Sequence, residues 1–106
     1  MAIQEATKNA ILIPFKVMET AFSGFGIIKE MVEKGNPNSI SDAGVGALAL
    51  RSCIKGAFLN VKINAAGVLD KEFVKSIIVR GTEIESKAEA AEEKILAIIS
   101  KSLMQT

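Results

Sequence analysis

The stretch SDAGVGALALRSCIKGAFLNVKINAA (residues 41–66) holds only three charges after its second residue, and these are Arg51, Lys55 and Lys62. At about 100° per residue, the three side chains project along one narrow edge of a helix. The other positions are apolar, small or amide, and a helix that is apolar nearly all round must be buried nearly all round. Two neighbouring helices cannot enclose it. We therefore expect a second copy of the chain, or another chain, to cover the rest.

The segments on either side also have helical periodicity. From about Gln4 to Lys34, apolar residues recur three and four positions apart. From Asp70 to about Leu103, an apolar stripe lies opposite an acidic face. The members of that stripe are Ile77, Gly81, Ile84, Ala88, Ala91, Ile95 and Ile98. These patterns predict an all-α fold, a bundle of three long helices completed by oligomerisation, in a single domain over residues 1–106.

Proline, glycine and serine residues separate the three segments. Pro14 either kinks the first helix or starts its main part, because proline lacks an amide hydrogen. Gly35 is expected to end this helix, with Pro37 blocking its continuation. Ser41 is the expected N-cap of the second helix, and Gly67 is expected to stop it.

The composition excludes several classes of function. A formal net charge of +1 gives neither the basic stripe expected of a nucleic-acid binder nor a polybasic run for an anionic membrane. Cys53 is the only cysteine and histidine is absent, so neither an internal disulfide nor a Cys/His zinc site can form, and no metal is expected. We find no signal peptide and no apolar run long enough to span a membrane, which favours a cytoplasmic location.

A stripe of small and polar residues runs along the second segment, opposite its basic edge. Its members are Asp42, Gly46, Ala49, Cys53, Gly56, Asn60 and Asn64. The small central residues leave room, and the polar ends offer an acceptor and amide groups, so the stripe can line a ligand slot. The stripe also suits close helix packing through Gly46, Ala49 and Gly56, with the asparagines bonded to neighbouring groups, and the pattern favours this interpretation. The sequence leaves both interpretations open.

Two further groups of residues have a structural and a functional interpretation. Ser41 and Asp42 suit the start of a helix, where they cap free amides, and also suit a cleft that holds a carboxylate for acid–base chemistry. Arg51, Lys55 and Lys62 can bind an anionic ligand tail or pair with glutamates of the third segment. No nucleophile–base pair can be proposed, because the chain has no histidine and its thiol lies in mid-helix.

The run GNPNSISDAGVGAL (residues 35–48), followed by GAFLNVKIN (residues 56–64), resembles the C-terminal half of the cyclodeaminase domain of formiminotransferase-cyclodeaminase. That family also includes bacterial methenyltetrahydrofolate cyclohydrolases, and PFKVME (residues 14–19) fits it as well. The resemblance implies an all-α fold and a homodimer with folate bound near the subunit interface. The family's N-terminal half, with its Pro-Gly-Gly-Gly-Ser type segment, has no counterpart here. We expect self-association in its place or a separate chain that supplies it.

The resemblance implies folate one-carbon chemistry, with a tetrahydrofolate derivative as substrate. A cyclodeaminase closes 5-formiminotetrahydrofolate to 5,10-methenyltetrahydrofolate and releases ammonia, and the related cyclohydrolase reaction involves the same methenyl compound. From residue chemistry and position, Asp42 is the candidate proton shuttle. The candidate ligand-binding residues are Asn38, Ser39 and Ser41 for orientation, Asn60 and Asn64 for the pterin, and Lys62 for the glutamate tail. The alternative is a catalytically inactive half-domain that acts as a helical oligomerisation or partner-binding subunit.

Overall fold

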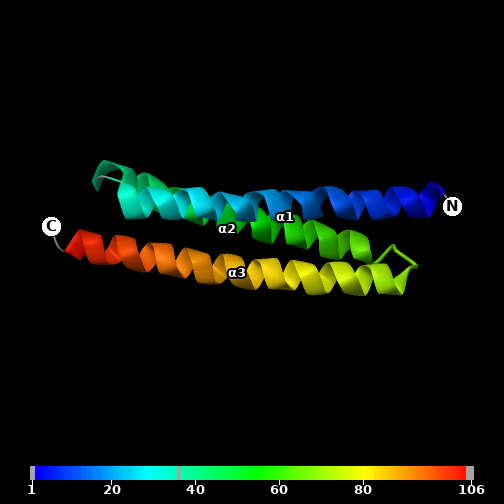
Figure 1. Ribbon diagram of the computed structural model, residues 1–106. Coiled ribbons are helices and arrows are strands. Elements are labelled where there is room, and N and C mark those ends of the chain that lie inside the picture. The colour runs from blue at the N-terminus through cyan, green and yellow to red at the C-terminus, as the bar shows by residue number, and fades with distance from the viewer. Residues whose placement is uncertain (1, 36, 105–106) are drawn as a thin grey trace.

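A computed structural model of the chain describes residues 2–35 and 37–104, with all of their side chains except those of residues 2, 37 and 38. The described residues form three α-helices and no strand (Figure 1). They are α1 (Ala2–Lys34), α2 (Pro37–Ala65) and α3 (Lys71–Met104). The prediction of an all-α fold built from three long helices is confirmed.

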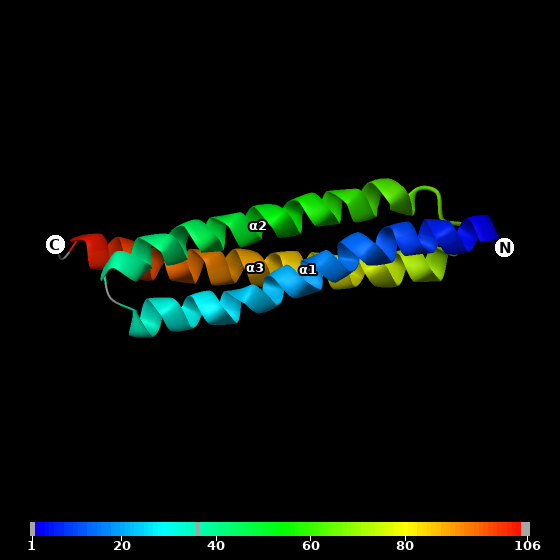
Figure 2. The ribbon, with the colours of Figure 1, turned by 90° about the horizontal axis from the view of Figure 1, so that it is seen from above.

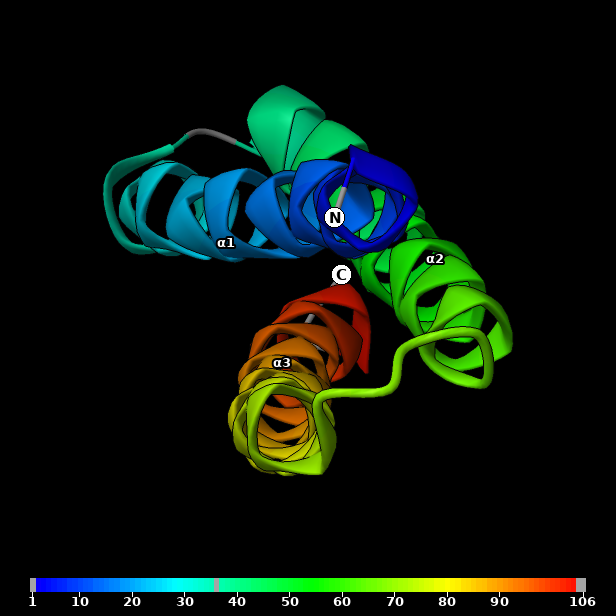
Figure 3. The same cartoon turned by 90° about the vertical axis from the view of Figure 1, so that its right-hand side faces the viewer.

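The helices run up, down and up along one common axis (Figures 1 and 2). Seen end-on, they occupy the corners of a triangle, and α2 forms one outer corner (Figure 3). The molecule measures 60 × 17 × 16 Å, as expected for helices of about 50 Å. The first turn of α1 lies beside the connection between α2 and α3, where the backbone amide of Leu69 donates to Oε1 of Gln4 at 3.0 Å. The connections between consecutive helices are short, so neighbouring helices in the sequence pack antiparallel to each other.

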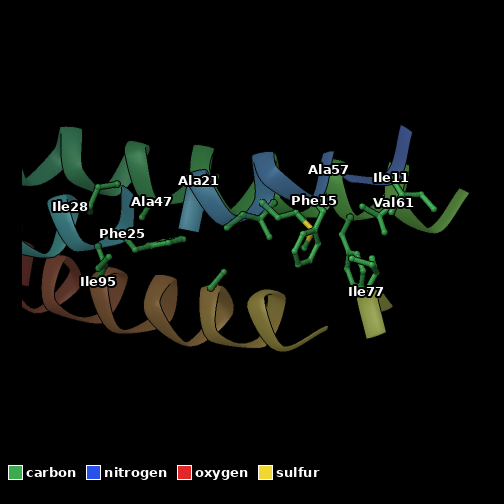
Figure 4. Packing of buried hydrophobic residues seen from close by; sticks show 14 of the residues in the cluster. Ile11, Phe15, Ala21, Phe25, Ile28, Ala47, Ala57, Val61, Ile77 and Ile95 are labelled. Atoms are coloured by element: carbon green, nitrogen blue, oxygen red, sulfur yellow. The ribbon is translucent and has the colours of Figure 1, made fainter. Parts of the chain in front are cut away.

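A single apolar core runs along the axis of the bundle, and each helix contributes one stripe to it (Figure 4). At 3% exposure or less, its most buried large side chains are Ile11, Phe15, Met18, Ile54, Phe58, Val61, Val68, Ile77 and Ile95. α2 and α3 pack closely where the Phe58 ring lies against Gly81. A Cβ atom on Gly81 would lie 2.9 Å from Cδ1 and Cζ of the Phe58 ring. The missing side chain of Gly81 is therefore what admits the ring.

The predicted start of α2 at Ser41 is wrong, because the helix begins four residues earlier at Pro37. Proline is favoured in the first turn of a helix, where its missing amide hydrogen has no partner to lose and its fixed φ is already helical. The sequence pattern alone suits Pro37 equally well as a block to the continuation of α1. Ser41 and Asp42 therefore lie in the second turn of α2, exposed to solvent, and Ser41 is not an N-cap.

The other predicted boundaries agree more closely with the structure. α1 continues through Pro14 without a break and ends at Lys34, just before Gly35. Asp70 caps α3, since its Oδ1 accepts the backbone amide of Phe73 at 3.1 Å. The predicted stripe of α3 is buried or half-buried up to Ile95. Its last member is Ile99, at 8% exposure, because Ile98 turns outward and is 42% exposed.

α2 has apolar side chains on two opposite faces. One face lies in the core, whereas Val45, Leu59 and Ile63 on the other are 59–68% exposed. The expectation that a single protomer leaves much of this helix uncovered therefore holds. Whether another copy covers it remains a prediction.

α1 corrects the expectation that no segment is apolar enough to cross a membrane. By length and composition alone, Ile3–Lys34 passes that test. Core helices of soluble proteins pass it as well, and the apolar residues of α1 include the fully buried Ile11 and Met18. One third of the apolar window is buried inside the bundle, so α1 has both a core-facing stripe and exposed apolar residues such as Ile13 and Ile27.

Candidate functional site

A groove of about 420 Å³ lies between the first half of α1 and the second half of α2. Ala10, Ile13, Pro14 and Val17 of α1 form one wall, and the other wall is formed by Cys53, Ala57, Asn60 and Asn64. A second hollow of about 360 Å³ continues it through the shared residues Val17 and Cys53 and adds Lys16 and Thr20. Together the two hollows have the size and the largely apolar lining of small-molecule sites.

Hydrogen-bonding groups are concentrated at one end of this groove. Pro14 has no amide hydrogen, so the carbonyl of Ala10 loses the partner it would have in a regular helix. Asn64 donates its Nδ2 to the carbonyl of Asn60 at 3.0 Å, which leaves its Oδ1 as an acceptor. The side chain of Asn60 is exposed on the same wall. The groove thus presents two asparagine side chains beside the apolar side chain of Ile13, on a stretch of α1 where Pro14 leaves the carbonyl of Ala10 without its regular helical donor.

The stripe of small and polar residues on α2 divides into two parts. The ligand-slot interpretation fits the second part, and the close-packing interpretation fits the first. Cys53, Asn60 and Asn64 border the open groove, as the ligand-slot interpretation expects. Gly46 packs closely, since a Cβ atom there would lie 3.0 Å from Cδ1 of Ile28 on α1. The second half of the stripe is therefore the part available to a ligand.

The residues predicted near the start of α2 lie far from the groove. Ser39 is half-buried, Ser41 and Asp42 are exposed, and the side chain of Asn38 lies outside the described residues. Asp42 and Asn60 are eighteen residues apart on one helix, which is about 27 Å along its axis. Within one protomer, the predicted site residues therefore form two separate groups at opposite ends of α2.

The basic edge of α2 faces away from the groove. Arg51 is 9% exposed. Its Nη2 lies 3.4 Å from Oε2 of Glu89 and its Nε lies 3.8 Å from Oε1 of Glu92, both on α3. Arg51 therefore pairs with glutamates of the third helix, which is the structural interpretation. Lys62 extends over the ring of Phe58, with Nζ 4.3 Å from the centroid. At about 100° per residue, Lys62 points to the opposite side of the helix from Asn60 and Asn64. The structure does not bring these three predicted ligand-binding residues together.

Lys16 is a cationic residue beside the groove that sequence reasoning missed. It is exposed and lines the 360 Å³ hollow with Val17 and Cys53. The signal available for it was its place in PFKVME (residues 14–19), which was noted only as a family-like run.

Comparison with known proteins identifies the family. A family model described as formiminotransferase-cyclodeaminase matches residues 1–100. The chain is 37% identical over 100 residues to a formimidoyltransferase-cyclodeaminase of Dictyostelium discoideum, covering 94% of this chain and 19% of that protein. It is 32% identical over 101 residues to a methenyltetrahydrofolate cyclohydrolase of Methylorubrum extorquens, covering 95% of this chain and 49% of that protein. The chain belongs to the formiminotransferase-cyclodeaminase family.

Membership of the formiminotransferase-cyclodeaminase family confirms the resemblance inferred from residues 35–48 and 56–64. It places the chain in a family of folate one-carbon metabolism. The chain spans about half the length of the cyclohydrolase and about a fifth of the length of the cyclodeaminase it matches.

A larger cavity of this family member, about 720 Å³, lies between α1 and α3. Phe22, Phe25, Ala91, Ile95 and Ile98 make its lining mainly apolar. Its lining also includes Ser23, Lys29, Glu93 and Lys94 but no asparagine. We take the α1–α2 groove, which two asparagine side chains border, as the candidate site.

Proposed function

We propose that this protein binds a reduced folate and catalyses the cyclodeaminase reaction, closing 5-formiminotetrahydrofolate to 5,10-methenyltetrahydrofolate with release of ammonia. The observation that carries the proposal is the α1–α2 groove of a family member, lined by apolar side chains and by the side chains of Asn60 and Asn64. Among the relatives compared, the cyclodeaminase of Dictyostelium discoideum has the higher identity, 37% against 32% for the cyclohydrolase.

The groove suits the two ends of a folate. A pterin ring presents amide, amino and ring-nitrogen groups along one edge, which match the amide of Asn60, the Oδ1 of Asn64 and the carbonyl of Ala10. Its flat faces suit the apolar wall that includes Ile13. Lys16, at the far side of the adjoining hollow, supplies a positive charge for the carboxylates of the glutamate tail. It replaces Lys62 in that role, since Lys62 is turned away.

The reaction requires the transfer of one proton from N10 to the departing amine. The N10 nitrogen attacks the carbon of the protonated formimino group, N5–CH=NH2+, so that an N10–C bond forms and the C=N π pair moves to the amine nitrogen. The tetrahedral centre then carries N5, N10 and a neutral NH2 group. The proton from N10 moves to the amine, the C–N bond to the amine breaks, and ammonia leaves with that bond's electron pair. A carboxylate can accept and return this proton and also stabilise the cationic product. Asp42 is the residue we propose for this role. Because it lies about 27 Å along α2 from Asn60 within one protomer, it can act on a folate in the groove only when a second copy of the chain supplies it.

Calorimetric titration with tetrahydrofolate and an absorbance assay for the methenyl product test the proposal. Replacing Asn60 with Ala should weaken folate binding by about two- to tenfold, which is the worth of one hydrogen bond. Asp42→Asn should leave binding nearly unchanged and lower turnover by about 10²–10⁴-fold, the usual contribution of a general acid–base group. Asn9→Ala, at an exposed position on α1, is the matched control and should change neither quantity.

Two results would contradict parts of this proposal. Full turnover by a folded Asp42→Asn variant would remove Asp42 from the mechanism. A well-folded chain that binds no folate would favour the other candidate function, a helical subunit that associates with further chains. That alternative draws support from the half-length match to the cyclohydrolase.

A further inference from the structure

The proposed function makes no use of the cavity between α1 and α3. At about 720 Å³ this cavity is larger than either hollow of the α1–α2 groove, and its volume is typical of small-molecule sites. Phe25 and Ile95, at 5% and 3% exposure, form its floor in the core of the bundle (Figure 4). Phe22, Ala91 and Ile98 complete the apolar lining.

The cavity is elongated and open to one side. In its C-terminal half α1 crosses over the bundle and diverges from α3 (Figure 2). Gly26 and Ala90 line the mouth with little or no side chain, and a Cβ atom on Gly26 would meet nothing within 4 Å. The lining spans residues 22–29 of α1 and 90–98 of α3, which is about 10–12 Å along the two helices. The space therefore suits a narrow apolar group that lies along the helices.

Lys29 occupies a position of α1 that the apolar periodicity of this helix assigns to the core. Five core-facing residues precede it in alternating steps of four and three, and Lys29 follows the last of them by four. These five residues are Ile11, Phe15, Met18, Phe22 and Phe25. All five are buried or half-buried, whereas Lys29 is exposed and borders the cavity. A charged residue at such a position breaks the local pattern, as residues of functional sites often do.

The charges nearest the apolar lining are positive. Lys29 borders the cavity from α1 and Lys94 borders it from α3. Nζ of Lys29 lies 3.9 Å from Oε1 of Glu33, a pair of exposed side chains that contributes little. Lys94 has no ion pair within residues 2–35 and 37–104. Glu93 also borders the cavity, but it lies about 140° around α3 from Ile98, whereas Lys94 lies about 40° away.

We propose that the α1–α3 cavity binds a medium-chain fatty acid. Its alkyl chain lies along Phe22, Phe25 and Ile95, and its carboxylate lies between Lys29 and Lys94. The chain covers apolar surface that the divergence of α1 leaves in water, and the carboxylate is complementary to two ammonium groups. A folate suits this cavity less well, because a pterin ring loses its hydrogen bonds to water over an apolar floor.

Calorimetric titration of the whole chain with sodium decanoate, kept well below its micellar concentration, tests the proposal. Decanol has the same chain length without the charge and serves as the comparison ligand. Decanoate should bind once per chain and about five- to twentyfold more tightly than decanol, which is the joint worth of two exposed ion pairs. The double variant Lys29→Met, Lys94→Met should lose this difference and keep its affinity for decanol. Lys87→Met, at an exposed position of α3 where Lys87 pairs with Glu83, is the matched control and should change neither affinity.

A cavity-filling variant tests the place of binding. Gly26→Leu puts a side chain into the mouth of the cavity, where a Cβ atom meets nothing within 4 Å. The variant should fold at least as well as the wild type, because leucine is a better helix former than glycine, and its melting curve checks this. It should bind both decanoate and decanol more than about tenfold more weakly. Unchanged affinity in folded Gly26→Leu would place the ligand elsewhere and overturn the proposal.

Three other results would also overturn it. They are no binding of decanoate by the folded wild type, equal affinity for decanoate and decanol, and displacement of decanoate by tetrahydrofolate, which would make the two sites one. The titration uses no folate, so its outcome is independent of the proposed function. A chain that binds decanoate as expected but no folate would refute the proposed function and leave the fatty-acid site standing.

Discussion

Gly81 shows how one position in a helix can set the distance between two helices. It lies in the middle of α3, where glycine costs about 0.5–1 kcal/mol of helix stability relative to alanine. The cost is offset by packing, because the ring of the fully buried Phe58 fills the space that a Cβ atom would occupy.

Gly81→Ala should therefore destabilise the protein despite its better helix propensity. We expect a loss of about 1–3 kcal/mol, typical of overpacking in a closed core, measured by urea denaturation. The matched control is Gly26→Ala on α1, where a Cβ atom would meet nothing within 4 Å. It should gain about 0.5–1 kcal/mol. If Gly81→Ala proves as stable as the wild type, the Phe58 contact is looser than described.

The candidate site residues could be predicted from the sequence by type but not by grouping. Asn60 and Asn64 were identified from their common face on α2, and both border the groove. Lys16 was missed because its relation to α2 depends on how α1 packs, which periodicity does not specify. The separation of Asp42 from the asparagines follows from helix geometry. The place of Pro14 in the groove could not be predicted, because it depends on which part of α1 packs beside Asn60 and Asn64.

At the scale of single elements, the connection between α2 and α3 is held mainly by Asp70. Its carboxylate accepts the amide of Phe73 at 3.1 Å and pairs with Nζ of Lys8 at 3.0 Å, which ties the start of α1 to the start of α3. The bond from Lys8, followed by that from the Phe73 amide, lowers the pKa of Asp70 from its ordinary value of 3.8.

The lowered pKa predicts a specific loss of stability in acid. Because the folded state favours the carboxylate, Asp70 contributes its full stabilisation above pH 3.8. That contribution is lost as the pH falls through the lower folded-state value. The difference in melting temperature between wild type and Asp70→Ala should therefore shrink below pH 3.8. A difference that stays constant into strong acid would show that the charge plays no part.

The helices themselves could be predicted because their apolar periodicity is long and regular. The predicted boundary was accurate at Asp70, which suits only the start of a helix. The prediction failed at Pro37, because a proline suits both the end of one helix and the start of the next. The last buried residue of the α3 stripe is Ile99 and not the predicted Ile98, and this difference has another cause. A stripe with steps of three and four drifts slowly around a helix, and packing decides which neighbour is buried.

At the scale of the whole molecule, the narrow rod leaves more surface in water than a compact protein of its mass would. If a second copy covers the exposed face of α2 that carries Val45, Leu59 and Ile63, as the family resemblance implies, dimerisation adds to the stability of the fold. The melting temperature should then rise with chain concentration, as mass action requires. Calorimetry over a wide range of concentrations measures this, and Leu59→Lys should abolish the dependence. A melting temperature independent of concentration in the wild type would indicate a protomer that is stable alone.

The short connections between the helices have a consequence for how the chain reaches this state. Each helix packs against the one that precedes it, so most pairings close small loops and little chain entropy is lost before contacts form. Bundles of this kind reach the native state in about microseconds to milliseconds. Contacts at large sequence separation, such as Lys8 with Asp70, separated by 62 residues, close larger loops and are expected to form later. Newly made protomers would thus acquire their shape well before they meet a partner at cellular concentrations.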